Sequence, residues 1–90
     1  MSFADTLREL RNKARMTKYR LAQDDGVDPA HVGRLEGGER LHPSRDLVLR
    51  MGQALLDYSG EISLKDVDQL LRSAGYGPVP RGRISIINLK

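Results

Sequence analysis

The stretch TKYRLAQDDGVDPAHVGRLEGG, residues 17–38, decides the fold of this chain. Thr17 can cap a helix through its hydroxyl, and Gly26 supplies the left-handed residue with which helices commonly end. Asp28 then offers a carboxylate to the free amides of a second helix. That helix starts at Pro29, where the missing amide hydrogen costs nothing. The stretch therefore predicts two short helices joined by a tight turn, with a pair of glycines closing the second.

Two short helices joined by a glycine-containing turn form a helix-turn-helix unit. The residues around this unit resemble the Cro/phage-repressor helix-turn-helix family, also called the XRE family. The matching pattern spans roughly the first two-thirds of the chain and consists of Leu7, Leu10, Arg11, Met16, Thr17, Leu21, Ala22, Gly26, Val27, Val32, Leu35, Glu36, Gly38, Arg40, Pro43 and Leu47. Each residue alone is a weak signal, whereas the ordered set is strong. The resemblance implies a domain whose second motif helix enters the major groove of DNA.

Apolar residues at helical spacing predict three further helices around the motif. All five helices are expected over residues 2–14, 17–24, 29–35, 44–56 and 63 to about 74. The predicted fold is thus an all-α, five-helix, lambda-repressor-like helix-turn-helix domain with a short C-terminal β-strand tail. Residues 1–58 are expected to form the DNA-binding core, on which residues 59–90 would pack.

The tail, RISIINLK at residues 83–90, alternates in polarity and is rich in β-branched residues, which predicts a strand. No second strand is evident in the chain. Two copies pairing across a two-fold axis would satisfy the strand's backbone and bury its apolar side chains. The residues expected at this dimer interface are Ile84, Ile86, Ile87 and Leu89. A tail that packs on its own subunit, or that has no fixed structure, is the alternative.

The outward side of the second motif helix carries the candidates for base readout, if Val32 and Leu35 face the core. These candidates are Pro29, Ala30, His31 and Arg34. Arg34 is the first choice, because a guanidinium matches the O6/N7 edge of guanine bidentately. Gly33 is a candidate point of close approach, since a glycine inside a helix costs about 1 kcal/mol relative to alanine. The residues expected to hold the DNA backbone are Thr17, Lys18, Tyr19, Arg40, His42, Ser44 and Arg45.

The resemblance also implies an ion pair between Arg11 and Glu36, which would tie the first helix to the third. Two independent surface charges are the alternative. The chain departs from the family pattern at Lys18, where glutamine is most common, and at Asp25, where an apolar residue is usual. A carboxylate at a helix C-terminus opposes the helix dipole. We therefore expect this helix to end a turn early or to direct Asp25 outward.

Composition narrows the classes of function. The chain holds 15 Lys and Arg against 12 Asp and Glu, and its basic residues concentrate over residues 8–20. It has no cysteine and two histidines, neither with a carboxylate at a recognisable spacing, and its glycines fit no nucleotide-binding loop. We therefore predict no catalytic site, no cofactor and no metal. No apolar run is long enough to cross a membrane, and a cytoplasmic location is expected.

The expected function is a sequence-specific, DNA-binding transcription regulator that acts as a homodimer on double-stranded DNA. The resemblance implies a repressor. The alternative is a protein-interaction module or an antitoxin-type protein that binds a partner through helix 63–74 and the tail. The basic first and second helices favour DNA, whereas the sparse readout face, built from proline, alanine and glycine, favours the alternative.

Overall fold

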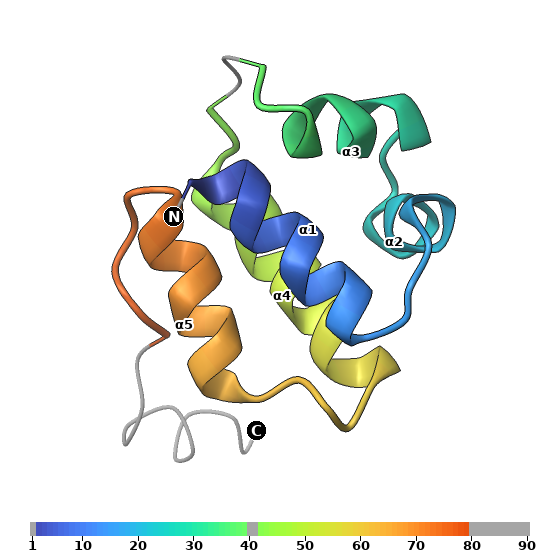
Figure 1. Ribbon diagram of the computed structural model, residues 1–90. Coiled ribbons are helices and arrows are strands. Elements are labelled where there is room, and N and C mark those ends of the chain that lie inside the picture. The colour runs from blue at the N-terminus through green and yellow to red at the C-terminus, as the bar shows by residue number, and fades with distance from the viewer. Residues whose placement is uncertain (1, 40–41, 80–90) are drawn as a thin grey trace.

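The computed structural model describes residues 2–39 and 42–79, which form five α-helices. In chain order these are α1 (Phe3–Lys13), α2 (Lys18–Asp25), α3 (Pro29–Glu36), α4 (Arg45–Tyr58) and α5 (Leu64–Ser73) (Figure 1). The all-α prediction is confirmed for this part of the chain. The predicted strand over 83–90, with Ile84, Ile86, Ile87 and Leu89, lies outside the described residues, as does Arg40.

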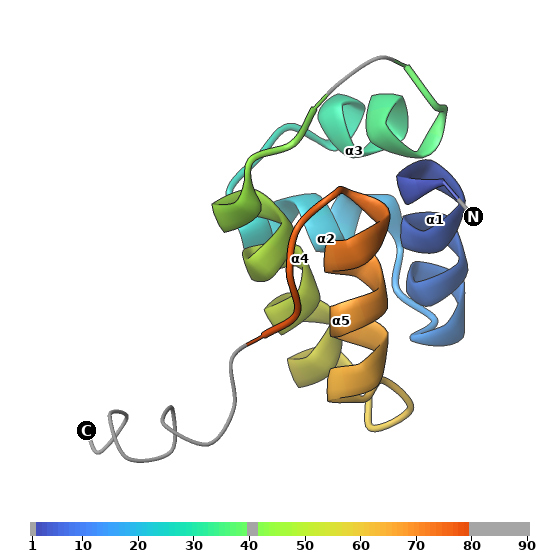
Figure 2. The ribbon, with the colours of Figure 1, turned by 90° about the vertical axis from the view of Figure 1, so that its left-hand side faces the viewer.

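The arrangement leaves α3 at one end of the molecule. α5 packs against both α1 and α4, as the turned view shows (Figure 2). α3 lies across the end of this group, in contact with α1 and α2, while α2 contacts α4. Two helices, α1 and α2, therefore pack against one side of the second motif helix.

Short polar residues set the start of every helix. The N-caps, each accepting a hydrogen bond from an amide of the first turn, are Ser2, Thr17, Asp28, Ser44 and Ser63. At α5 the cap is reciprocal, because the Asp66 carboxylate also accepts the Ser63 backbone N–H at 3.0 Å. Burial by itself acts to raise the pKa of Asp66, but the hydrogen bonds from Ser63 and the ion pair with Lys13 outweigh it. The pKa of Asp66 therefore lies below its ordinary value.

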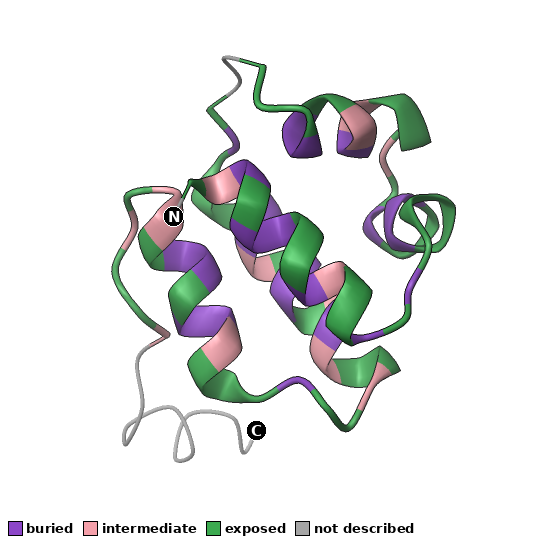
Figure 3. Ribbon diagram, in the orientation of Figure 1, coloured by how far each residue is buried: buried purple, intermediate pink, exposed green. Residues whose placement is uncertain are grey.

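One apolar core joins all five helices, and buried and exposed positions alternate along each of them (Figure 3). Its largest fully buried side chains are Leu7, Met16, Leu21, Val32, Val48, Met51, Leu55, Leu70 and Leu71. α4 and α5 approach closely at Gly52, where a Cβ would come within 2.7 Å of a methyl carbon of Val67. The fifth helix is therefore part of the same core as the helix-turn-helix unit.

The helix boundaries fall within a residue of the sequence prediction, except at the end of α4. α4 continues to Tyr58, two residues beyond the expected end. Both expectations for Asp25 are wrong: α2 runs through this residue and its side chain is buried, with 3% exposed. The chain then reverses at Gly26, which has a φ of 70°. Because the left-handed turn starts only after Asp25, the helix carries this carboxylate into the position that an apolar residue would fill.

Candidate nucleic-acid interface

The outward side of α3 presents the side chains predicted to read bases. Val32, Leu35 and Glu36 are buried on the side facing the rest of the molecule. Pro29, Ala30 and Arg34 are exposed, and His31 and Gly33 are half-buried. Asp28 and Pro29 produce this helix start as expected, because the Asp28 carboxylate accepts the Ala30 N–H at 3.1 Å. The result is a solvent-facing side of α3 that carries one long cation, Arg34, in the last turn of the helix.

The starts of α2 and α4 carry most of the residues predicted to hold the DNA backbone. Exposed at these two positions are Thr17, Lys18, Tyr19, His42, Ser44 and Arg45. Tyr19 is among the most exposed apolar side chains described, at 65%. The Thr17 and Ser44 hydroxyls accept amides of their own helices at 3.0 and 3.1 Å, so each keeps its O–H hydrogen for another acceptor. Free amides and the helix dipole add positive potential at both starts.

Cations in the described part of the chain divide into paired and unpaired sets. Carboxylates lie within ion-pair distance of Arg8, Arg11, Lys13, Arg20 and Arg50. The described cations without an ion pair to another described residue are Arg15, Lys18, Arg34, Arg45, Lys65 and Arg72. Lys18, Arg34 and Arg45 stand apart from the other three by their place in the fold. They lie on α2, α3 and α4, among the residues predicted to contact DNA. Their charges remain available for phosphate or base acceptors.

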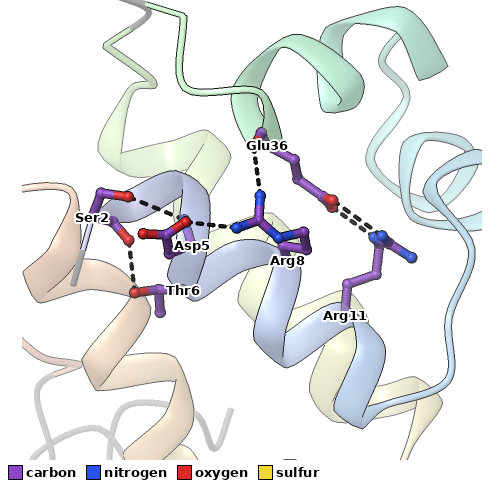
Figure 4. A network of polar contacts seen from close by, with 6 residues as sticks. All are labelled: Ser2, Asp5, Thr6, Arg8, Arg11 and Glu36. Carbon is purple, nitrogen blue, oxygen red and sulfur yellow. Dashed lines mark hydrogen bonds and ion pairs between the residues drawn. The ribbon is translucent and has the colours of Figure 1, made fainter.

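A polar network fixes the inner end of α3 to α1 (Figure 4). Arg11 donates to both carboxylate oxygens of Glu36, from Nε at 2.6 Å and from Nη2 at 3.0 Å. Its Nη1 also donates to the Met16 carbonyl at 2.8 Å, just before α2. The pair is buried, with 13% of the Arg11 and 2% of the Glu36 side chain exposed. The ion pair implied by the sequence is thus present, and it joins three segments rather than two.

Arg8 makes a second connection that the sequence reasoning missed. Its guanidinium donates to the Glu36 carbonyl at 3.0 Å and to the Asp5 carboxylate at 2.6 Å. A cation at this carbonyl satisfies the C-terminal end of α3 and favours the helix dipole. The available signal was spacing, because Arg8 lies three residues before Arg11 and so on the same side of α1.

Asp25 is a buried carboxylate at the end of α2, the first helix of the helix-turn-helix unit. Neither carboxylate oxygen has a hydrogen-bond partner, although both are buried. Burial raises the pKa of Asp25 to about 6. The charge of Arg50 opposes this shift and that of Asp24 adds to it. Arg50 donates instead to the Asp25 carbonyl at 3.2 Å, which caps the end of α2. This residue lies in the packing between α2 and α4 rather than among the DNA-facing side chains.

The described residues offer little to other classes of site. No group of three or more His, Cys, Asp or Glu among residues 2–39 and 42–79 could hold a metal ion. No helix within those ranges is both long and apolar enough to cross a membrane. Among the residues that the structure describes, those predicted for DNA contact lie on α3, at the start of α2, and at or just before the start of α4.

Comparison with protein-family models agrees with this geometry. A model described as a helix-turn-helix domain matches residues 2–56, which include α1 to α3 and most of α4. The chain belongs to this helix-turn-helix family. The match is consistent with the resemblance to XRE-type proteins, and a domain of this kind points to a DNA-binding regulator. Comparison with curated proteins and with solved structures gives no match. The helix-turn-helix family match ends before α5, which the fold nevertheless builds into the same core.

Proposed function

We propose that this helix-turn-helix protein is a sequence-specific transcription regulator, a repressor, that acts in the cytoplasm as a homodimer. Each subunit places α3 in the major groove, with Pro29, Ala30, His31 and Arg34 toward the bases. The observation that carries the proposal is the exposed side of α3, where Arg34 has no ion-pair partner among the described residues. An arginine there can pair with guanine, and the other candidates give shape and methyl contacts.

The DNA backbone is held from the flanks of α3. Contacts come from Thr17, Lys18, Tyr19, Arg40, His42, Ser44 and Arg45. Phosphate contacts fix the register of the protein and make its affinity depend on salt. Two subunits joined through Ile84, Ile86, Ile87 and Leu89 would reach half-sites about one helical turn apart on a near-palindromic site.

The test is the affinity for random duplex DNA over a salt series. The proteins compared are the wild type, Lys18→Ala and Arg34→Ala, with Lys65→Ala on the exposed side of α5 as a matched control. We expect a negative slope of log K against log salt, shallower by about one unit without Lys18 and unchanged without Lys65. Arg34→Ala should matter little on random DNA and cost about 1–3 kcal/mol on a selected site. No binding by the wild type at low salt would contradict the proposal.

The homodimer has a separate test. Sedimentation of the wild type should give a dimer, and Ile86→Lys should give a monomer that still unfolds cooperatively. A wild type that sediments as a monomer at high concentration would reject the dimer and leave DNA binding by one subunit.

A second candidate is a protein-interaction module, including an antitoxin that binds both a partner protein and DNA. The observation that favours it is the small size of the readout face, where exposed Pro29 and Ala30 offer no side-chain hydrogen bonds. Hydrogen exchange separates the candidates. Protection of residues 28–45 by DNA supports the regulator, whereas protection of α5 and the tail by a protein, with none by DNA, supports the module.

A further inference from the structure

A tyrosine beyond the helix-turn-helix unit reaches into the loop before α4. Tyr76 follows α5, and its hydroxyl donates to the Pro43 carbonyl at 2.6 Å. The same oxygen lies 3.4 Å from His42 Nε2, and the two rings lie 5.8 Å apart, tilted by 37°. His42 and Pro43 directly precede Ser44, the cap of α4. Tyr76 thus contacts the loop that presents part of the proposed DNA-backbone surface.

The hydrogen-bond chemistry assigns an orientation to the imidazole. The hydroxyl hydrogen of Tyr76 is used by the Pro43 carbonyl, so the tyrosine oxygen can only accept from His42. A hydrogen bond across this 3.4 Å contact places the hydrogen on Nε2 and leaves Nδ1, an acceptor in the neutral ring, for a group outside the chain. A protonated His42 would present its Nδ1–H to such a group while keeping the bond to tyrosine.

Tyr76 is itself held firmly. Its backbone N–H donates to the Leu71 carbonyl at 2.9 Å, at the end of α5. Three residues later, the Val79 N–H donates to a carboxylate oxygen of Asp68 at 2.9 Å, which fixes the returning segment to the same helix (Figure 2). Leu71 is fully buried in the core. Through these bonds the loop at His42 is tied to the core by way of α5.

We propose that Tyr76 is a positioning residue of the DNA interface, which holds the His42 ring and the loop before Ser44 in place for contact with a DNA phosphate. The inference rests on the proposed function. An ordered side chain loses less conformational entropy on binding, so the tyrosine raises affinity without touching DNA. It also gives α5 a role in DNA binding, although the helix-turn-helix family match does not include that helix.

A double-mutant cycle tests this coupling. DNA affinity over a salt series is measured for the wild type, Tyr76→Phe, His42→Ala and the double variant. Tyr76→Phe keeps the ring and removes the hydroxyl. We expect affinity to fall about three- to tenfold, in line with the loss of one ordered hydrogen bond. We also expect the salt slope to approach that of His42→Ala, and the double variant to match His42→Ala alone. Tyr58→Phe, at the far end of α4, is the matched control and should leave affinity unchanged.

The outcomes separate this inference from the proposed function. A wild type that does not bind DNA rejects both. A wild type that binds, with Tyr76→Phe equal to it or with additive effects of the two changes, rejects the positioning role alone. Nitrogen NMR of the free wild type gives a readout independent of DNA. In the spectrum of the neutral imidazole, the Nε2–H tautomer of His42 supports the inference and the Nδ1–H tautomer overturns it.

Discussion

Replacing Gly33 with alanine should make the protein more stable and its DNA binding weaker. Gly33 lies inside α3, where glycine is less favourable than alanine by about 0.5–1 kcal/mol. A Cβ built at this position meets no atom within 4 Å, so nothing in the described chain requires a glycine. We therefore expect the free energy of unfolding to rise by about 0.5–1 kcal/mol and Tm by a few degrees.

DNA binding should change in the opposite direction. Ala30, Gly33 and Arg34 lie on the outward side of α3, since residues three and four apart share one side of a helix. A methyl group added there would enter the space between the helix and the floor of the groove. Overpacking of a fitted contact costs about 1–3 kcal/mol, which corresponds to a loss of about five- to 150-fold in affinity for a selected site.

The assay pairs urea unfolding with titration of a selected DNA site. Gly60→Ala is the control, because a Cβ at Gly60 also meets no atom within 4 Å and this residue lies in the connection between α4 and α5. It should leave DNA affinity unchanged. If Gly33→Ala bound DNA as well as the wild type, the reasoning about close approach would be refuted. If it gave no gain in stability, the reasoning about the helical glycine would fail.

Three further predictions concern stability. The raised pKa of Asp25, about 6, means that its contribution is complete below the ordinary value of 3.8 and is lost as pH rises through 6. In urea unfolding, the free energy of unfolding of the wild type should therefore fall by about 1.4 kcal/mol relative to that of Asp25→Asn between about pH 5 and about pH 8. A difference between the two proteins that stays constant with pH would contradict this. Arg11→Ala leaves the Glu36 carboxylate buried without its cation and should lower the free energy of unfolding by about 3–5 kcal/mol. Replacing both residues by apolar ones should lower it less. If the double variant lost as much as Arg11→Ala, or the sum of the two single losses, the pairing argument would be rejected. Gly52→Ala forces Val67 to move and should lower the free energy of unfolding by about 1–3 kcal/mol. Adding Val67→Ala to this variant should recover part of the loss in a thermal melt. No recovery would show that the contact between the two residues does not cause the loss.

Local chemistry made the helix starts predictable. The caps at Thr17, Asp28 and Ser44 each act on an amide two or three residues ahead, so the sequence alone contains both partners. The left-handed residue at Gly26 follows from the same short range. The outward side of α3 followed too, because burying Val32 and Leu35 leaves only one side for Arg34.

Contacts between distant segments were less accessible. Arg8 reaches the Glu36 carbonyl across 28 positions, and Tyr76 reaches Pro43 across 33. Helical spacing places Arg8 on the same side of α1 as Arg11, but it does not identify a partner so far along the chain. At Asp25 the sequence did lead to a prediction, and the prediction was wrong. The charge of this residue argued for exposure, but the packing of α2 on α4 overrode that preference and the position stayed buried. The pairing of Arg11 with Glu36 came from the family resemblance, not from spacing.

The division of α3 into an anchored side and an open side has a consequence for how such a protein changes its target. Among the described residues, the buried contacts and side-chain hydrogen bonds of α3 come from Val32, Leu35, Glu36 and the Asp28 cap, whereas the side chains of Ala30 and Arg34 lie outside the core. With the proposed function, target preference can thus be changed at the open positions while the scaffold keeps its stability. A library randomised at Ala30, His31 and Arg34 alone should yield folded proteins with new operators, which makes this small domain a practical starting point for engineered DNA readers.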